Sequence, residues 1–174
     1  MDLSYPIGKF REPESITPEL VSQWIADIAA TPAHIREAVA DLDDAQLDTP
    51  YRPGGWTVRQ VIHHVPDSHL NSYVRFKLAV TETEPTIKPY DETKWAELPD
   101  ARSGPIEPSL QLLESLHLRW VAFLRSLTPA DFSRRFNHPE DGICRLDRTI
   151  GIYAWHGKHH AAHISSLRNR MGWK

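Results

Sequence analysis

The chain has 174 residues, of which 40% are hydrophobic and 25% charged, and a formal net charge of −3. A chain of this length can bury a core of its own, so we expect one domain over residues 1–174. The weak negative charge argues against a general nucleic-acid-binding protein. No apolar run approaches the ~20 residues of a membrane span. A single cysteine excludes an internal disulfide, and we expect a cytoplasmic protein.

The first half of the chain contains two segments with the apolar spacing of amphipathic helices. The first is expected to begin at Thr17, an N-cap followed by proline, to kink or restart at Pro32, and to resume through Leu42. The second is expected to run from Thr57, also an N-cap, to about Thr81, with a bend at its internal proline. Both helices should turn an apolar face toward a common core.

The second half adds two more helices. Residues 83–108 hold five prolines and read as a long irregular connection without a helix. A helix is expected over 109–127, a short β-hairpin within 131–146 around an Asp-Gly pair, and a last helix over 148–170 capped by Asp147. The pattern predicts an all-α fold: a four-helix bundle with a long irregular connection and a small β-hairpin before the last helix.

The stretch WHGKHHAAHI, residues 155–164, places four histidines on the last predicted helix. On a helical wheel His156 and His160 lie near the middle of the apolar arc, His163 lies nearby, and His159 lies at its margin. The pair at i and i+4 is a metal-ligand spacing. The alternative is that each ring forms a hydrogen bond with a neighbouring carbonyl or carboxylate. The glutamate of the HExxH zinc-peptidase motif is absent.

A third ligand has to come from another helix, and the second helix offers three histidines. His64 lies nearer the apolar side than His63, whereas His69 looks central. Pro66 interrupts the phase between them, so periodicity leaves this choice open.

Two long stretches are recognisable at this point. "WTVRQVIHHVPDSHLNSYVRFKLA" and "YAWHGKHHAAHISSLRNRMGW" closely resemble the DinB/YfiT-like family, and within it the YfiT branch of proposed metal-dependent hydrolases. The resemblance extends over nearly the whole chain, from residue 3 to residue 173. It implies a four-helix bundle, a divalent metal ion and a homodimer.

The resemblance also assigns the ligands. In that family a histidine follows the tryptophan of the second helix by eight positions in a W…HxxD pattern, which here is Trp56, His64 and Asp67. The remaining ligands are the HxxxH pair, which corresponds to His156 and His160. The family pattern therefore selects His64 on the second helix and agrees with the wheel on the last.

Three neutral imidazoles and an open position are typical of a catalytic zinc site, although nickel fits the same ligands. A cation held by neutral ligands keeps its full charge and lowers the pKa of bound water toward ~7. The same cation would stabilise a bound thiolate. We therefore expect one divalent ion, with zinc as the first choice.

Each of the neighbouring polar residues has more than one candidate role. Asp67 is a candidate catalytic base or a carboxylate that orients a ligand, with an ordinary solvent-facing carboxylate as the alternative. His69, His159 and His163 could line a pocket, move protons or simply pack, and the role of His63 is not predicted.

Three other residues each have a functional interpretation and a plainer one. Arg59 and Arg75 could bind an anionic substrate group, although surface arginines are usually just solvated. Cys144 is more typical of a small buried side chain than of a nucleophile.

The first functional hypothesis is a metal-dependent hydrolase that activates water and acts on a small-molecule substrate. A second is a metal-dependent S-transferase that conjugates a low-molecular-weight thiol to an electrophile, as enzymes of the wider family do. A third is a metal-binding bundle without catalysis. Neither a nucleic acid nor a membrane is an expected partner.

Overall fold

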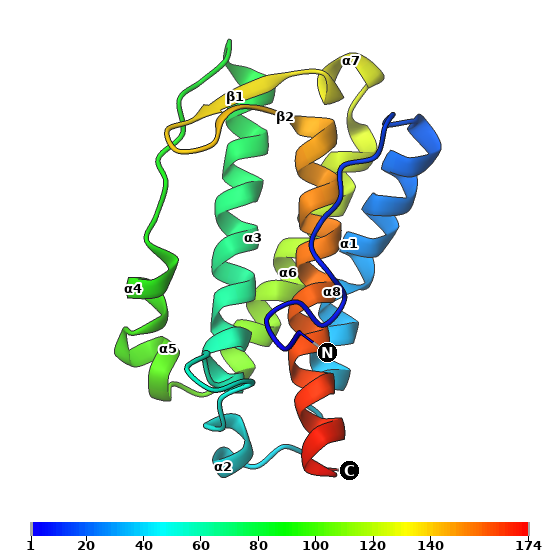
Figure 1. The fold of residues 1–174 in the computed structure, drawn as a ribbon. Helices are drawn as coiled ribbons and strands as arrows, with labels where there is room; N and C mark the ends of the chain where they lie inside the picture. The colour runs from blue at the N-terminus through cyan, green and yellow to red at the C-terminus, as the bar shows by residue number, and fades with distance from the viewer. Residues whose placement is uncertain (1, 174) are drawn as a thin grey trace.

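The computed structural model describes residues 2–173, which are mostly helical with one short pair of strands. Four long helices run alongside one another in Figure 1. In chain order the helices and strands are α1 (Pro18–Ala38), α2 (Asp44–Leu47), α3 (Val58–Thr81), α4 (Glu92–Ala96), α5 (Pro99–Ser103), α6 (Glu107–Ser126), α7 (Pro129–Phe132), β1 (Arg135–His138), β2 (Gly142–Arg145) and α8 (Leu146–Met171).

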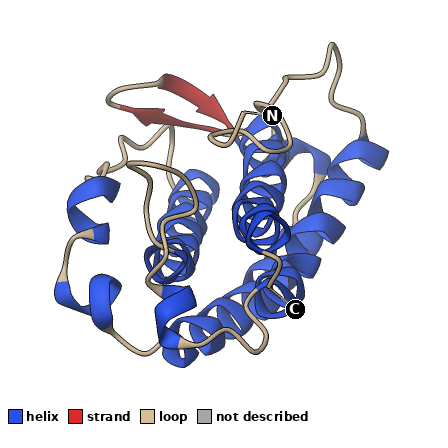
Figure 2. Cartoon of the chain, turned by 60° about the horizontal axis from the view of Figure 1, so that its bottom comes forward, coloured by secondary structure: helices blue, strands red, loops and turns tan. Residues whose placement is uncertain are grey.

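The four long helices form the predicted bundle. α1 packs against α8 and α6, and α3 packs against α6 and α8. Figure 2 shows the strand pair lying across one end of the helices. Within the described residues, no helix combines the length and the apolar character that crossing a membrane requires.

Two of the helix starts have the side-chain caps that the sequence predicted. The hydroxyl of Thr17 accepts a hydrogen bond from the Leu20 N–H at 3.2 Å. Thr57 accepts from the Gln60 N–H at 3.1 Å, and the Gln60 side chain accepts from the Thr57 N–H at 2.9 Å. This reciprocal pair is a capping box, which satisfies two backbone donors at the start of α3.

The predicted start of the last helix is wrong by two residues. α8 spans Leu146–Met171 rather than 148–170, and no side chain caps it. Asp147 lies inside the first turn, where its carboxylate accepts from the Arg148 N–H at 2.7 Å and from the Arg145 guanidinium. The helix follows β2 directly, and a carboxylate in its first turn is favoured by the helix dipole.

Neither internal proline ends its helix. Pro32 lies within α1 and Pro66 lies within α3. Each proline costs about one backbone hydrogen bond, and packing of the buried helix faces along their full length outweighs this cost. The prediction that the first helix resumes through Leu42 is wrong, since α1 ends at Ala38. A separate short helix, α2, then begins at a capping box built on Asp43.

The connection over 83–108 is more ordered than predicted. It contains the short helices α4 and α5, which pack against α3. α4 begins where the Asp91 carboxylate accepts from the Lys94 N–H at 2.9 Å. The side-chain amide of Gln60 donates to the Ala96 carbonyl at 2.8 Å, which ties α4 to α3. Sequence periodicity cannot detect helices of five residues that depend on such contacts.

The predicted β-hairpin is present. β1 and β2 pair antiparallel, with Phe136 opposite Cys144. Gly142 has a φ of +76°, the left-handed conformation that glycine adopts without strain, and it follows the predicted turn residue Asp141.

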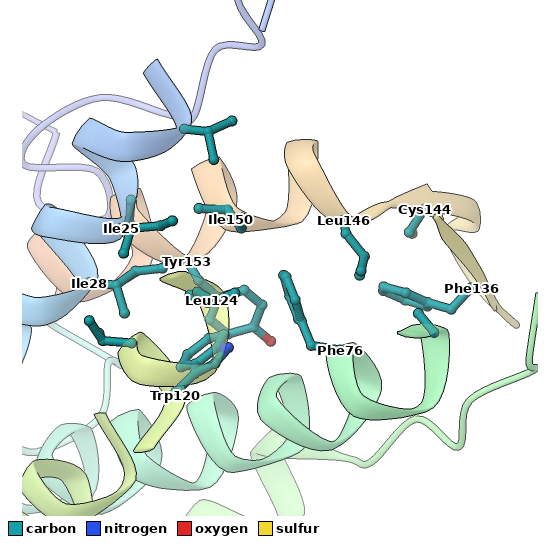
Figure 3. Close-up of a cluster of buried hydrophobic side chains, with 14 of the residues drawn as sticks. Ile25, Ile28, Phe76, Trp120, Leu124, Phe136, Cys144, Leu146, Ile150 and Tyr153 are labelled. Atoms are coloured by element: carbon teal, nitrogen blue, oxygen red, sulfur yellow. The ribbon is translucent and has the colours of Figure 1, made fainter. Parts of the chain in front are cut away.

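Two apolar clusters occupy the bundle, one toward each end. Figure 3 shows the first, in which Trp120 and Phe76 pack among aliphatic side chains of α1, α6 and α8. The second contains Val61, Leu113 and Ile164. On α8 the stretch between the two clusters carries four histidines, and on α3 it carries His69, so polar rings lie between the two apolar ends of the bundle.

Candidate metal centre

The three histidines expected as ligands converge on one point. Nε2 of His156 lies 3.3 Å from Nε2 of His64 and 3.2 Å from Nε2 of His160. The ligand atoms of all three rings fall within 4.8 Å of one another. Two nitrogens bound tetrahedrally to zinc at ~2.0–2.1 Å lie about 3.3 Å apart. The spacing of these rings therefore fits a single divalent ion.

The local sequence explains why the rings meet. His156 and His160 are one turn apart on α8 and project from the same face. α8 packs against α3, which carries His64. One helix thus carries two of the expected ligands and its neighbour carries the third.

Burial keeps these imidazoles neutral. It lowers the pKa of His64 to about 4 and holds the pKa values of His156 and His160 well below their ordinary range, with the neighbouring histidines adding to the effect. A neutral imidazole retains a lone pair, which metal binding requires. The cluster is therefore ready to bind a cation at neutral pH without first losing protons.

A cavity of about 510 Å³ adjoins the three rings. This volume is within the range of small-molecule sites, about 300–1,000 Å³. Its walls come from the N-terminal segment, the loop before α3, the start of α4 and one face of α8; they include Tyr5, Arg52, Trp56, Glu92 and Trp155.

Two of the remaining histidines face different surroundings. His63 points away from the cavity, with Nδ1 2.7 Å from the hydroxyl of Ser109 at the start of α6. His159 lines the cavity and stacks on Trp155, with ring centroids 4.3 Å apart. Nδ1 of His159 is buried and forms no hydrogen bond within the described residues.

His69 and His163 contact the rings of the proposed ligands. Nε2 of His69 lies 3.0 Å from Nδ1 of His156, and Nδ1 of His163 lies 3.4 Å from Nδ1 of His160. His163 also belongs to a second group of close nitrogens, together with His159 and His160. That group lies on α8 alone and shares His160, whereas the first group draws on two helices and has the spacing of metal ligands.

Asp67 and Glu92 differ in their position relative to the cavity. Asp67 is half-buried and is not part of the cavity lining; burial and then Asp100 raise its pKa to about 6. Glu92 does line the cavity; the residue is exposed, and partial desolvation and then the carboxylates of Asp91 and Glu140 raise its pKa. Sequence reasoning missed Glu92 because it lies in the connection between α3 and α6, and the only local signal was its place at the start of α4.

The other three residues considered in the sequence are Arg59, Arg75 and Cys144. Arg59 is buried, and its guanidinium donates to Asp44 at 2.8 Å and to Asp48 at 2.7 Å, so it joins α3 to α2. Arg75 lines a different cavity. Cys144 is buried, which raises the pKa of its thiol and disfavours the reactive thiolate.

A four-helix bundle with three converging imidazoles beside a small-molecule-sized cavity defines a class of helical-bundle proteins suited to bind one divalent ion. The DinB superfamily model matches residues 27–164, and the chain belongs to this superfamily.

Curated relatives cover the full length of the chain. A protein of Bacillus mycoides strain KBAB4 is 60% identical over 172 residues, 99% of each chain, and one of Bacillus cereus strain 03BB102 is 59% identical over the same length. Both have been provisionally named metal-dependent hydrolases. Among solved structures, YfiT from Bacillus subtilis matches with a TM-score of 0.97 and 51% identity over 100% of both chains. It is described as a probable metal-dependent hydrolase with an unusual four-helix bundle topology.

Proposed function

We propose that this protein is a metal-dependent hydrolase whose divalent ion is held by His64, His156 and His160. The observation that carries the proposal is the 3.2–3.3 Å spacing of their Nε2 atoms beside a cavity of about 510 Å³. The names of the relatives support the same class of reaction. Zinc is the first choice of ion, and nickel fits the same ligands.

A bound divalent ion would lower the pKa of a water molecule and polarise a substrate oxygen. The side chains around the cavity supply the rest. Glu92 is the carboxylate of the cavity wall and takes the proton from the attacking water. Arg52 offers a positive charge for an anionic group of the substrate, and the indoles of Trp56 and Trp155 form apolar walls. The substrate is therefore a small molecule with a polar, hydrolysable group.

Metal analysis is the first test. The protein is loaded with Zn²⁺ or Ni²⁺, dialysed and measured by elemental analysis. We expect about one ion per chain in the wild type and loss of binding in H156A/H160A. The matched control is H34A, because His34 is exposed on α1 and should leave metal content unchanged. Equal metal content in H156A/H160A and the wild type would refute the proposed site.

Activity assays test the reaction itself. The metal-loaded protein is incubated with panels of ester, amide and phosphate substrates, each with and without a low-molecular-weight thiol. Product release without thiol supports the hydrolase. Product formation only with thiol, as a thioether conjugate, would replace it with the S-transferase. A loaded protein inactive under both conditions would favour a metal-binding bundle without catalysis.

A further inference from the structure

Two series of hydrogen bonds run from the proposed ligands to backbone carbonyls. The first, which we call the inner relay, joins His156 to His69, His117 and the carbonyl of Ile28. The successive N···N, N···N and N···O distances are 3.0, 2.8 and 2.7 Å. The second, which we call the outer relay, joins His160 to His163 and the carbonyl of Ser4.

The carbonyl end determines the direction of the inner relay. A carbonyl oxygen only accepts, so the Nδ1–H of His117 donates to Ile28. His117 is 2% exposed, and burial lowers its pKa to about 4, so the ring carries no second proton. Its Nε2 therefore accepts from the Nδ1–H of His69.

The same reasoning continues to the ligand. His69 is 0% exposed, and such burial favours the neutral ring, so its single proton lies on Nδ1, the atom that donates to His117. Its Nε2 must then accept from the Nδ1–H of His156. With its proton on Nδ1, His156 has a lone pair on Nε2, the atom that faces His64 and His160.

The outer relay reaches the same result for the second ligand. Nε2 of His163 lies 3.1 Å from the carbonyl of Ser4, so this nitrogen donates. Nδ1 of His163 is then an acceptor, 3.4 Å from Nδ1 of His160. His160 donates from Nδ1, and its Nε2 also keeps a lone pair directed at the common point.

We propose that His69 and His163 are positioning residues that fix His156 and His160 as Nδ1–H tautomers and thereby direct both Nε2 lone pairs at the ion. This proposal rests on the proposed metal site. Metal-bound histidines usually donate to a carboxylate, a carbonyl or water. In this protein His156 and His160 each donate to a second imidazole, so the partner of neither ring carries a negative charge.

Packing holds both partner rings in place. His69 lies edge-on to Trp120 and to Tyr153, with centroids 5.7 and 5.1 Å apart. His163 stacks on Tyr51 at 3.9 Å. A role in packing alone is thus the competing explanation, and the test has to distinguish filling of space from hydrogen bonding.

The first experiment determines tautomers in the metal-free wild type. Long-range ¹H–¹⁵N correlation spectra of the imidazoles distinguish a protonated Nδ1 from a protonated Nε2. We expect His156 and His160 to be Nδ1–H tautomers. Nε2–H tautomers of these two rings would overturn the proposal, whether or not the protein binds an ion.

The second experiment compares pairs of variants that fill similar space. H69Q places an amide oxygen near the position of Nε2, and H163N places one near Nδ1, so each retains an acceptor; H69L and H163L do not. Metal affinity is measured by competition with a chromophoric chelator. We expect H69L and H163L to bind Zn²⁺ about 10–100-fold more weakly than the wild type, and H69Q and H163N to recover most of this loss.

Each outcome has a definite meaning. Equal affinity of H69L and H69Q, with both folded by circular dichroism, would leave packing as the only role of His69. If H69L does not fold, two measurements test the proposal instead. They are the metal affinity of H69Q relative to the wild type and the tautomers of the wild-type imidazoles. A wild type that binds no ion but shows Nδ1–H tautomers would refute the metal site and support the relays.

Discussion

At the scale of single residues, Asp67 illustrates the free-energy cost of a half-buried, ionised carboxylate on α3. Burial, and to a lesser degree Asp100, raises its pKa from 3.8 to about 6. Because the folded-state pKa is above the unfolded value, the folded protein favours the protonated form. The contribution of Asp67 to stability is therefore most favourable below about pH 4 and is lost as the pH rises through about 6.

The variant D67N should accordingly stabilise the metal-free protein at pH 7.5. Since the side chain is half-exposed, we expect a gain of about 1 kcal/mol, or about 2–4 °C in Tm for a chain of this size. At pH 4 the wild-type and D67N curves should nearly coincide. Differential scanning calorimetry at both pH values tests this, and a lower Tm for D67N at pH 7.5 would contradict the stated cause of the pKa shift.

Glu92 is the residue whose role depends most directly on the proposed reaction. E92Q removes the proposed base while keeping the size of the side chain, and should lower kcat about 10²–10⁴-fold on any substrate identified. Metal content should not change. The control is E97Q, because Glu97 lies just after the same helix and binds Arg102 at 2.8 Å. An E92Q enzyme with full activity would exclude Glu92 as the base.

At the scale of elements, the contact between α1 and α8 depends on two glycines. A Cβ on Gly151 would lie 2.8 Å from the indole of Trp24, and one on Gly157 would overlap the side chain of Thr31. The two helices therefore approach more closely than alanine would allow. Gly157 follows His156 directly, so the same close approach helps to place a ligand.

The substitution G157A tests this contact. In an uncrowded helix, alanine in place of glycine stabilises by about 0.5–1 kcal/mol, but the overlap should cost about 1–3 kcal/mol. We expect a net loss of about 2–6 °C in Tm. T31A/G157A should recover part of it, since the overlapping hydroxyl and methyl are removed. Costs that simply add in the double-mutant cycle would show that Thr31 is not the obstacle.

The elements also show what a sequence can predict. The long helices and the HxxxH pair follow from periodicity, because one-turn spacing puts both rings on one face whatever the tertiary structure. The short helices α4 and α5, and with them Glu92, depend on contacts with α3 that no local pattern encodes. His64 can be preferred to His63 and His69 only from the family resemblance, since Pro66 interrupts the helical periodicity of this segment.

The hydrogen-bond partners in the two relays are still harder to predict from the sequence. His69 was recognised as a central position, but its bond to His117 joins α3 to α6 across 48 residues. His163 finds its acceptor in the N-terminal segment, 159 residues away. Such hydrogen-bond partners are determined by the packing of whole helices. The spacing of histidines along one helix therefore does not indicate which acceptor in another segment each ring will contact.

At the scale of the whole molecule, the proposed metal centre would join α3 to α8. The unfolded chain has no preformed site, since its three ligands come from positions 64, 156 and 160. An ion held by these ligands would therefore bind the folded state preferentially, and its binding free energy would add to the free energy of unfolding. The size of the effect depends on the free-ion concentration relative to Kd.

Removal of the metal should consequently lower the melting temperature. At a free Zn²⁺ concentration 1,000 times Kd, the ion stabilises the fold by about 4 kcal/mol, which corresponds to about 8–16 °C for a chain of this length. Thermal unfolding is followed by circular dichroism with added Zn²⁺ and with chelator. H156A/H160A should show no such difference, whereas H34A should behave as the wild type. An equal shift in H156A/H160A would mean that the stabilising ion binds elsewhere, because that variant lacks two of the three proposed ligands.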